Sequence, residues 1–429
     1  MLQSSERKGR LDKGCLKNRK VDDRMYKKNF KLRLAGIFTG AAMAFIAIAP
    51  AAPNGMAVAE AAEEETLPEE TLGENEETDS LPPQLPGLTY ESTMELSFAN
   101  CFDVYYYNDG YKLLDVKDSV KYLIVPEGME APEGLDGEIC VLQQPLDTIY
   151  MAATSPMALF DALDGLGNIR LSGLDASGWY IDAAAQAVEN GDMLFAGKYD
   201  EPDYELLVAE NCDLAIESTM IFHSPKVQEM IEMLGIPVFV DRSSYETHPL
   251  GRTEWIKLYG AMLNKEEEAE SFFDGQAQVI EKMKDFPNTE KTVTFFYINT
   301  SGAPVVRNPE DYISSMIEIA GGRNAFEGLE DDSGKTSVAI TMEEFYNTAV
   351  DSDYLIYNSS IDATVTCLDD LLAKDALLAD FKAIQEGNVW LTEKAMYQHT
   401  DTIGELISDV NLMLTDGDPE EMTFLRKLD

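Results

Sequence analysis

The stretch SYETHPLGRTEWIKLYGAML (244–263) follows a strand-like run, PVFVD (237–241), and begins a helical pattern that continues beyond it. Apolar residues recur at steps of three, four and seven, at Trp255, Tyr259, Met262, Ala269, Phe273, Ile280 and Met283. Pro249 suits a first helical turn, and Pro287 ends the pattern. Roughly 35 residues at about 1.5 Å each give a length on the order of 50 Å, which matches the width of two α/β lobes. The stretch therefore predicts one long helix over 249–287 that joins two lobes stiffly, so that the cleft between them opens by small angles.

Short apolar runs alternate with helical segments on both sides of this stretch. Before it, we expect strands at 148–154, 169–173, 193–197, 214–218 and 237–241 and helices at 156–163, 180–191, 202–211 and 225–235. After it, we expect strands at 292–299, 337–341, 353–359 and 388–393 and helices at 310–322 and 401–414. This alternation is typical of parallel sheets covered by helices on both faces. The sequence predicts an α/β fold with two parallel-sheet lobes, at 89–248 and 288–429, and a ligand cleft between them. A β-hairpin around the Asn-Asp-Gly turn at 108–110 is expected to lead the first lobe.

The N-terminal region has the composition of an export signal. A basic segment, MYKKNFKLR (25–33), precedes the apolar LAGIFTGAAMAFIAIAPAAP (34–53) and a run of small residues. We predict a signal over 1–59, with Met25 as an alternative start, and hence a secreted, periplasmic or cell-surface protein. A retained membrane anchor is the alternative, although two prolines shorten the apolar run. The acidic, proline-rich residues 60–88 are expected to be a disordered spacer, because they have too little apolar surface to bury.

Charge and motifs exclude several classes of function. The formal net charge of −45 disfavours binding to nucleic acid or to anionic membranes. The sequence has no GxSxG, P-loop, HExxH or Rossmann glycine series, so we predict that the protein is not an enzyme. Four cysteines follow the predicted signal without metal-type spacing, at Cys101, Cys140, Cys212 and Cys367. Free thiols are the favoured interpretation, and one disulfide is the alternative.

Two segments, YELLVAENCDLAIE (204–217) and MEEFYNTAVDSDYLIY (342–357), share one plan. Each has a short helix opened by an acid, then an aspartate and an apolar strand. The acids are Glu205, eight residues before its aspartate, and Glu344, nine residues before its own. Two similar half-structures produce such an echo, although chance similarity between αβ units is also common.

Several motifs together resemble those of one family. They are the PDYELLVAENCDLAI segment (202–216), IEIAGGRNAF (317–326) and AIQEGNVWLTE (383–393), set around the long helix. Over about 140–414, the chain resembles the solute-binding proteins of ABC transporters for iron-siderophore, haem and cobalamin. The chain lacks the lipobox cysteine that many such proteins carry after the apolar run, and its loop ETHPLGRTEW (246–255) is not the commonest form of the family's helix start. The resemblance implies a monomer that captures a ferric siderophore, haem or cobalamin, needs no resident cofactor and delivers its ligand to an ABC permease. It also implies a docking glutamate on each lobe, which we assign to Glu205 and, less directly, to Glu310.

Candidate ligand residues follow the predicted strands, because ligands of open α/β sheets meet the carboxyl ends of the strands. We rate the loop 242–252 as the best candidate because it carries a dense set of charged and aromatic groups. The candidates are Thr154, Ser155, Trp179, Tyr180, Tyr199, Met220, His223, Arg242, Tyr245, His248 and Arg252 in the first lobe, and Arg307, Asn358, Ser359 and Tyr397 in the second.

Two rival functions remain open at this point. The chain has only three histidines, His223, His248 and His399, and together with a carboxylate they are suited to a bare Zn²⁺ or Mn²⁺. Separate, solvated or satisfied histidines are the more common outcome, and a histidine or tyrosine ligand to haem is a further option. A secreted enzyme or chelatase on the same fold requires a converging acid–base pair, which the sequence does not supply.

Overall fold

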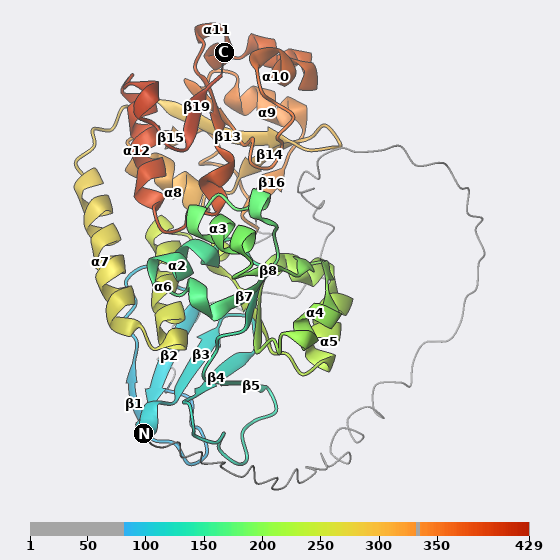
Figure 1. Ribbon diagram of the computed structural model, residues 1–429. Coiled ribbons are helices and arrows are strands. Elements are labelled where there is room, and N and C mark those ends of the chain that lie inside the picture. Colours follow the sequence, from blue (N-terminus) through green and yellow to red (C-terminus); the bar gives the residue numbers. More distant parts are fainter. Residues whose placement is uncertain (1–80, 332–334, 429) are drawn as a thin grey trace, which may run out of the picture. The chain divides into compact units, whose positions relative to one another are not determined.

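A computed structural model describes residues 81–331 and 335–428 (Figure 1). The predicted signal and residues 60–80 of the predicted spacer lie outside these ranges. All described residues belong to one compact unit, Val58–Asp429. Within them, no helix combines the length and the apolar character needed to cross a membrane.

The last residues of the predicted spacer are ordered, so the prediction of disorder is wrong for 81–88. Leu85 is 7% exposed and lies in one hydrophobic cluster with Tyr105 and Tyr107. The Tyr107 hydroxyl donates a hydrogen bond to the Pro83 carbonyl at 2.6 Å. The leucine provides the apolar surface that the acidic part of the segment lacks, and it anchors the chain to the first sheet.

The first sheet contains the predicted hairpin and extends it to five strands. Its order is β1-β2-β3-β4-β5, antiparallel except for the parallel pair β4 and β5. The strands are β1 Tyr90–Thr93, β2 Phe102–Tyr107, β3 Lys112–Val116, β4 Lys121–Val125 and β5 Ile139–Gln143. A turn at Asn108–Gly110 joins β2 to β3, as predicted.

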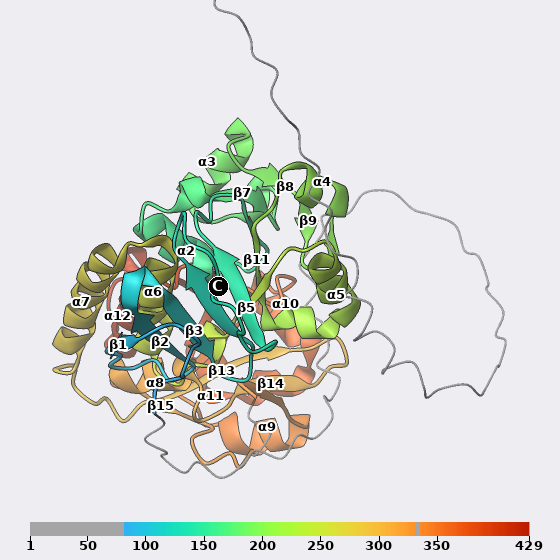
Figure 2. The ribbon, with the colours of Figure 1, turned by 90° about the horizontal axis from the view of Figure 1, so that it is seen from below.

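The second sheet is parallel throughout and confirms the predicted N-terminal lobe. Its order is β12-β11-β6-β7-β8. The strands are β6 Ile149–Met151, β7 Ile169–Ser172, β8 Leu194–Phe195, β11 Leu214–Ser218 and β12 Val238–Asp241, with a small β9–β10 ribbon at Gly197–Lys198 and Glu201–Pro202. The helices are α2 Pro156–Ala162, α3 Asp182–Asn190, α4 Tyr204–Ala209 and α5 Pro225–Met233. Neighbouring residues of β6 point to different hydrophobic clusters. Met151 lies in the cluster that contains residues of α2 and α6, and Tyr150 lies in the cluster that contains residues of α4 and α5. Figures 1 and 2 show these helices on the two faces of the sheet.

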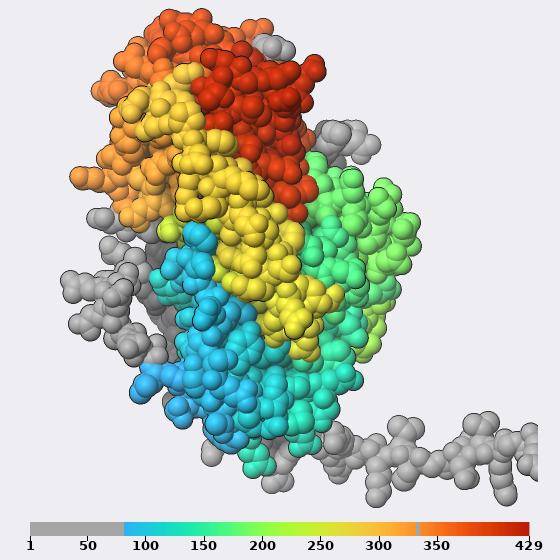
Figure 3. All heavy atoms as spheres, turned by 90° about the vertical axis from the view of Figure 1, so that its left-hand side faces the viewer, coloured from blue at the N-terminus to red at the C-terminus, as the bar shows by residue number. Residues whose placement is uncertain are grey.

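The predicted single helix is two antiparallel helices that lie side by side, α6 Pro249–Leu263 and α7 Glu266–Met283. Lys257 of α6 reaches α7 twice, with Nζ 3.0 Å from Glu270 Oε2 and 4.6 Å from the centre of the Phe273 ring. The prediction of one continuous helix over 249–287 is therefore wrong. Figure 3 shows α7 on the surface, running toward the C-terminal part of the chain.

Local chemistry explains the break. Asn264 ends α6 in the left-handed conformation, with φ 58° and ψ 42°. Three acids then open α7, where the helix dipole favours negative charge: Glu266, Glu267 and Glu268. From the first sheet, Lys112 Nζ donates to the Ala261 carbonyl and to Asn264 Oδ1, both at 2.8 Å, and pairs with Glu266. The first sheet thus holds the turn between the two helices.

The third sheet forms the C-terminal lobe and is mixed rather than wholly parallel. Its order is β16-β14-β13-β17-β18-β19, with β15 beside β13; β14, β16 and β19 are the antiparallel additions. The strands are β13 Thr292–Ile298, β14 Pro304–Arg307, β15 Arg323–Asn324, β16 Ser337–Ala339, β17 Tyr354–Tyr357, β18 Val389–Thr392 and β19 Leu425–Lys427. The helices are α8 Tyr312–Ile319, α9 Met342–Ala349, α10 Leu368–Lys374, α11 Lys382–Glu386 and α12 Ile403–Leu414.

The similarity between the segments 204–217 and 342–357 of the two lobes has a structural basis. Asp213, before β11, accepts the backbone N–H of Thr148 at 3.0 Å, next to the start of the parallel strand β6. Asp353, before β17, accepts the N–H of Thr292 at 2.8 Å, at the start of the parallel strand β13. Each aspartate therefore ties together the amino ends of two neighbouring parallel strands.

Candidate ligand-binding site

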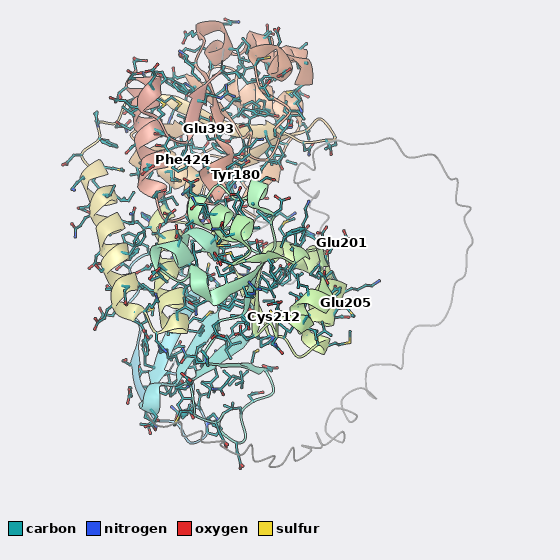
Figure 4. All side chains as sticks on the ribbon, viewed as in Figure 1. Tyr180, Glu201, Glu205, Cys212, Glu393 and Phe424 are labelled. Carbon is teal, nitrogen blue, oxygen red and sulfur yellow. The ribbon has the colours of Figure 1, made fainter. Side chains whose placement is uncertain are left out.

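The two lobes meet along a set of hydrogen bonds that we call the lobe junction. Thr400, after β18, donates its hydroxyl to the Ser155 carbonyl at 2.7 Å, and its own carbonyl accepts from the Thr253 hydroxyl at 2.9 Å. Gln398 accepts the backbone N–H of Tyr180 and donates to the Gly178 carbonyl, both at 2.8 Å. Loops at the carboxyl ends of strands in both lobes thus face each other. Figure 4 places Tyr180 and Phe424 at this boundary.

Two arginines lie at the junction. The Arg252 guanidinium, on α6, sits 4.2 Å over the ring of Tyr312, the first residue of α8. Arg252 is 4% exposed, its buried Nε has no hydrogen-bond partner, and it forms no ion pair with a carboxylate of the described residues. Arg307, the last residue of β14, has Nη1 3.7 Å from Asp311 Oδ2 and donates to the Tyr397 hydroxyl. One buried carboxylate thus stands beside two buried guanidinium groups.

Three of these groups are buried, since Arg252, Asp311 and Tyr312 are at most 5% exposed. Burial raises the pKa of Asp311, and the charges of Arg307 and Arg252 oppose that rise. Burial likewise raises the pKa of the Tyr312 hydroxyl to about 12, so that this tyrosine is neutral at ordinary pH. Asn358, after β17, donates to the Tyr397 hydroxyl at 2.7 Å and completes the cluster on the C-terminal side.

Two hollows adjoin the junction. An enclosed one of about 10 Å³ is lined by Arg252, Tyr312, Ile313, Met316, Met396, His399, Thr400, Ile403, Leu406 and Phe424. It has room for about one water molecule. An open hollow of about 350 Å³ lies between Thr247 and the start of α8, and its other lining residues are Pro309, Glu310, Asp311, Ser315 and Glu318.

Several predicted ligand residues come together at the junction. Ser155, Tyr180 and Arg252 approach from the N-terminal lobe, and Tyr397 stands next to Gln398 in the C-terminal lobe. Arg307 and Asn358 join them through the Tyr397 hydroxyl. Ser359 is buried and donates to the Thr392 carbonyl.

Other predicted residues of the first lobe have local roles instead. Arg242 donates to the Asp118 side chain at 3.3 Å and lies 4.9 Å over the Tyr245 ring. Trp179 is 5% exposed and donates to the Ser172 hydroxyl at 2.9 Å, which is the role of a core tryptophan. Tyr199 packs against the cluster beneath α4 and α5. Thr154 is half-buried before α2, and Met220 lies in the short helix Thr219–His223.

The three histidines do not form one site. His248 caps α6, with Nδ1 accepting the Leu250 N–H at 3.1 Å, and burial lowers its pKa. His223 is exposed, and His399 lies at the junction, 3.2 Å from the Tyr180 carbonyl. In the part of the chain that the structure describes, no three histidine, cysteine or acidic side chains are placed to hold a metal ion. All four cysteines after the predicted signal carry free thiols.

Sequence reasoning missed Gln398 and Thr400, two of the residues that join the lobes. Both follow β18 within a few residues of the predicted Tyr397. The expectation that ligand residues follow the carboxyl ends of strands, here called the strand-end rule, therefore pointed to this segment. The sequence did not predict Tyr312 and Asp311 for a different reason. They begin a helix, and a helix cap is the ordinary role of such an aspartate, which here accepts the Ile313 N–H at 3.0 Å.

The model of the periplasmic binding protein family matches residues 175–395, just over half of the chain. The chain belongs to the periplasmic binding protein family. This family comprises substrate-binding proteins of ABC transporters and not enzymes, as the sequence predicted. The matched segment runs from just before α3 to just after β18; it excludes the five-stranded first sheet, β6 and β7 of the second sheet, and β19 of the third.

Two curated relatives of this periplasmic binding protein are uncharacterized lipoproteins of Methanocaldococcus jannaschii. They are 26% and 25% identical to it, over 62% and 70% of the chain. The aligned part spans 64% of the first relative's length, less than two thirds, and 77% of the second's.

Solved structures of periplasmic binding proteins share the fold. A periplasmic heme binding protein from Pseudomonas aeruginosa aligns with a TM-score of 0.53 and 16% identity, over 66% of this chain and 98% of that one. An ABC transporter substrate-binding protein from Listeria monocytogenes aligns with a TM-score of 0.50 and 15% identity, over 63% and 98%. A periplasmic heme-binding protein from Roseiflexus aligns with a TM-score of 0.50 and 17% identity, over the same shares.

Proposed function

We propose that this protein is an extracytoplasmic solute-binding protein that captures a metal chelate between its lobes and delivers it to an ABC permease. The chelate is a ferric siderophore, haem or cobalamin, and its metal travels as part of the cargo. Family membership supports the transport role. The names of two solved neighbours, both heme-binding proteins, support the chelate class. The lipoprotein names of the curated relatives support a location outside the cytoplasm.

The observation that carries this proposal is the charge at the lobe junction. The chain has a formal net charge of −45, yet Arg252 is buried there without a carboxylate partner among the described residues. Arg252 and Arg307 share the one buried carboxylate of Asp311, so the junction keeps an excess of buried positive charge, which is suited to an anionic ligand. Carboxylate, catecholate and propionate groups of chelates supply the negative charge.

A chelate does not fit the enclosed hollow at the junction without movement, although the open hollow beside it, at about 350 Å³, lies within the size range of ligand pockets. The enclosed hollow of about 10 Å³ is far smaller than ligand pockets, which measure roughly 300–1,000 Å³. Binding at the enclosed hollow therefore requires the loops of Ser155 and Tyr180 to part from those of Gln398 and Thr400. That movement gives up the hydrogen bonds of Thr400 with Ser155 and of Gln398 with Tyr180 and Gly178, and it suits a small rotation of one lobe against the other.

Thermal melts with ferric siderophores, haemin, cobalamin, Zn²⁺ and Mn²⁺ test the ligand class, because a ligand that binds only the folded protein raises the melting temperature. We expect a rise with one of the chelates. For that chelate, Arg252→Ala is expected to weaken binding about tenfold in calorimetry, because a hydrogen bond to a charged group is lost.

The matched control is Arg323→Ala, which removes an arginine of β15 that is 53% exposed and pairs with Glu327. This variant is expected to bind like the native protein. Native affinity in Arg252→Ala contradicts a ligand site at the junction. A rise in melting temperature with Zn²⁺ or Mn²⁺ alone, lost in His248→Ala, replaces the chelate proposal with a bare-metal one.

The permease contact is proposed at two exposed glutamates that occupy equivalent places in the lobes. Glu205 lies in the first turn of α4 and Glu344 in the first turn of α9, and each helix precedes one of the two strand-tying aspartates. Glu310, the C-terminal candidate from the sequence, instead lines the open hollow at the junction. The structural equivalence favours Glu344 as the partner of Glu205.

Glu205→Lys is expected to leave chelate affinity unchanged and to lower uptake several-fold in a reconstituted transporter, because a rim charge sets orientation and encounter rate. Uptake is measured with the binding protein at limiting concentration. Glu281→Lys makes the same change of charge on α7, at a side chain that is 67% exposed, and serves as the control. Native uptake by Glu205→Lys removes this residue from the docking surface.

A further inference from the structure

His399 has an acceptor at each of its ring nitrogens. Nε2 lies 3.2 Å from the backbone carbonyl of Tyr180, which belongs to the opposite lobe. Nδ1 lies 3.4 Å from Oδ1 of Asp401, an oxygen that is buried and has no hydrogen-bond partner among the described residues. The ring is thus held between a carbonyl of one lobe and a carboxylate of the other.

A neutral imidazole cannot satisfy both contacts. It carries one N–H, so whichever nitrogen donates, the other presents its lone pair to an oxygen that accepts and cannot donate. Only the imidazolium donates on both sides. The geometry of the lobe junction therefore matches the protonated side chain, and deprotonation leaves one contact repulsive.

Some charged groups around the His399 ring favour its protonation, and others oppose it. Asp401 and Glu405 from the C-terminal lobe and Asp161 on α2 favour the imidazolium, while Arg252 lines the same small hollow and opposes it. The pKa of His399 is raised by its contact with Asp401, although burial opposes the rise, and the Tyr180 carbonyl and Glu405 raise it further. The Phe424 ring, centred 5.7 Å away, adds apolar surface but no charge.

We propose that His399 is a pH-sensitive clasp between the lobes: its protonated ring donates to the Tyr180 carbonyl of one lobe while its charge pairs with Asp401 of the other, and this favours the joined arrangement. Because the folded protein binds this proton more tightly than an unconstrained histidine does, the stabilisation is fully present below the ordinary pKa of about 6.5. It is lost as the pH rises through the raised value. The clasp itself is independent of any ligand, whereas its effect on release rests on the function proposed above: ligand is retained longer in acid and released more readily in alkali.

Hydrogen exchange at one backbone amide measures the clasp without a ligand. The Tyr180 N–H donates across the junction to Gln398, so its protection reports whether the lobes are joined. After correction for intrinsic exchange, we expect about tenfold more protection at pH 5.5 than at pH 8.5, a ratio that corresponds to about 1.4 kcal/mol. The Ala215 amide, bonded to the Pro237 carbonyl at 2.9 Å inside the second sheet, is the internal reference.

Two variants separate the clasp from a merely structural contact. His399→Gln still donates to the Tyr180 carbonyl but does not titrate, so the pH dependence of Tyr180 protection is expected to vanish. His223→Gln, at an exposed position, is expected to keep it. With only three histidines in the chain, proton resonances assign each titration directly. Equal protection at both pH values in the native protein, or a pH dependence that persists in His399→Gln, overturns the proposal. Because no chelate is added, either result stands whatever the transported ligand proves to be.

Discussion

Glu254→Ala is expected to lower the free energy of unfolding by about 3–5 kcal/mol, the range for removing one partner of a buried charge pair. The Glu254 side chain is fully buried on α6. Its carboxylate accepts the backbone N–H groups of the three residues that lead into β2, Ser97, Phe98 and Ala99, at 2.8–3.1 Å. It also pairs with Lys257 at 3.2 Å. Alanine leaves three backbone amides without their acceptor and removes one of the two carboxylate partners of Lys257, which keeps Glu270 at 3.0 Å.

Glu270→Ala is the matched control because Glu270 pairs with the same Lys257, at 3.0 Å, from a side chain that is 57% exposed. Its loss is expected to cost about 1 kcal/mol or less. Urea unfolding followed by circular dichroism and tryptophan fluorescence measures both variants. Equal losses in the two variants show that the ion pair with Lys257 matters and that the amide contacts of Glu254 do not.

The alternating strands and helices were predictable because each carries its own local signal. The strand at 214–218 is β11 to the residue, since a short apolar run between an aspartate and a serine cap leaves little freedom in its ends. The antiparallel strands were harder: β16 begins where a strand was predicted, whereas β14 and β19 were not predicted. Their short segments look like those of a parallel sheet, and only pairing between distant residues sets their direction.

The strand-end rule predicted part of the candidate site. It found Ser155, Tyr180, Asn358 and Tyr397, because parallel strands bring their carboxyl ends to one edge. Arg307 reaches the same place by another route, from the end of the antiparallel strand β14. The rule cannot tell a loop that faces the other lobe from one that packs on its own. Arg242 and His248 are of the second kind, since the first sheet and the start of α6 use their side chains.

The break between α6 and α7 is the clearest failure of the sequence analysis. Its signals were present, because asparagine is a common residue after a helix and three acids in a row suit the start of the next one. The apolar period of the segment continued across them and outweighed them. The spacing of apolar residues shows which face of a helix is buried. Two helices of a hairpin that pack these faces against each other have the same apolar spacing as one continuous helix. Close approach at the crossing is the feature that distinguishes the two cases.

Gly260 provides that close approach, so Gly260→Ala is expected to destabilise the protein by about 2–3 kcal/mol, as overpacking does in a filled core. A Cβ on Gly260 comes within 2.6 Å of the Ala269 Cβ and 2.9 Å of the Lys265 carbonyl oxygen. Relief requires α7 to move away from α6, which strains the contacts of Lys257 with Glu270 and Phe273.

Gly275→Ala makes the same substitution inside α7, where a Cβ meets nothing within 4 Å. There the change is expected to stabilise the protein by about 0.5–1 kcal/mol through helix propensity alone. Urea unfolding of the two variants measures free-energy changes of opposite sign for one chemical change. A continuous helix over 249–287 predicts stabilisation at both positions, because Gly260 and Ala269 then lie about 13 Å apart at 1.5 Å per residue. Stabilisation by Gly260→Ala therefore contradicts the hairpin.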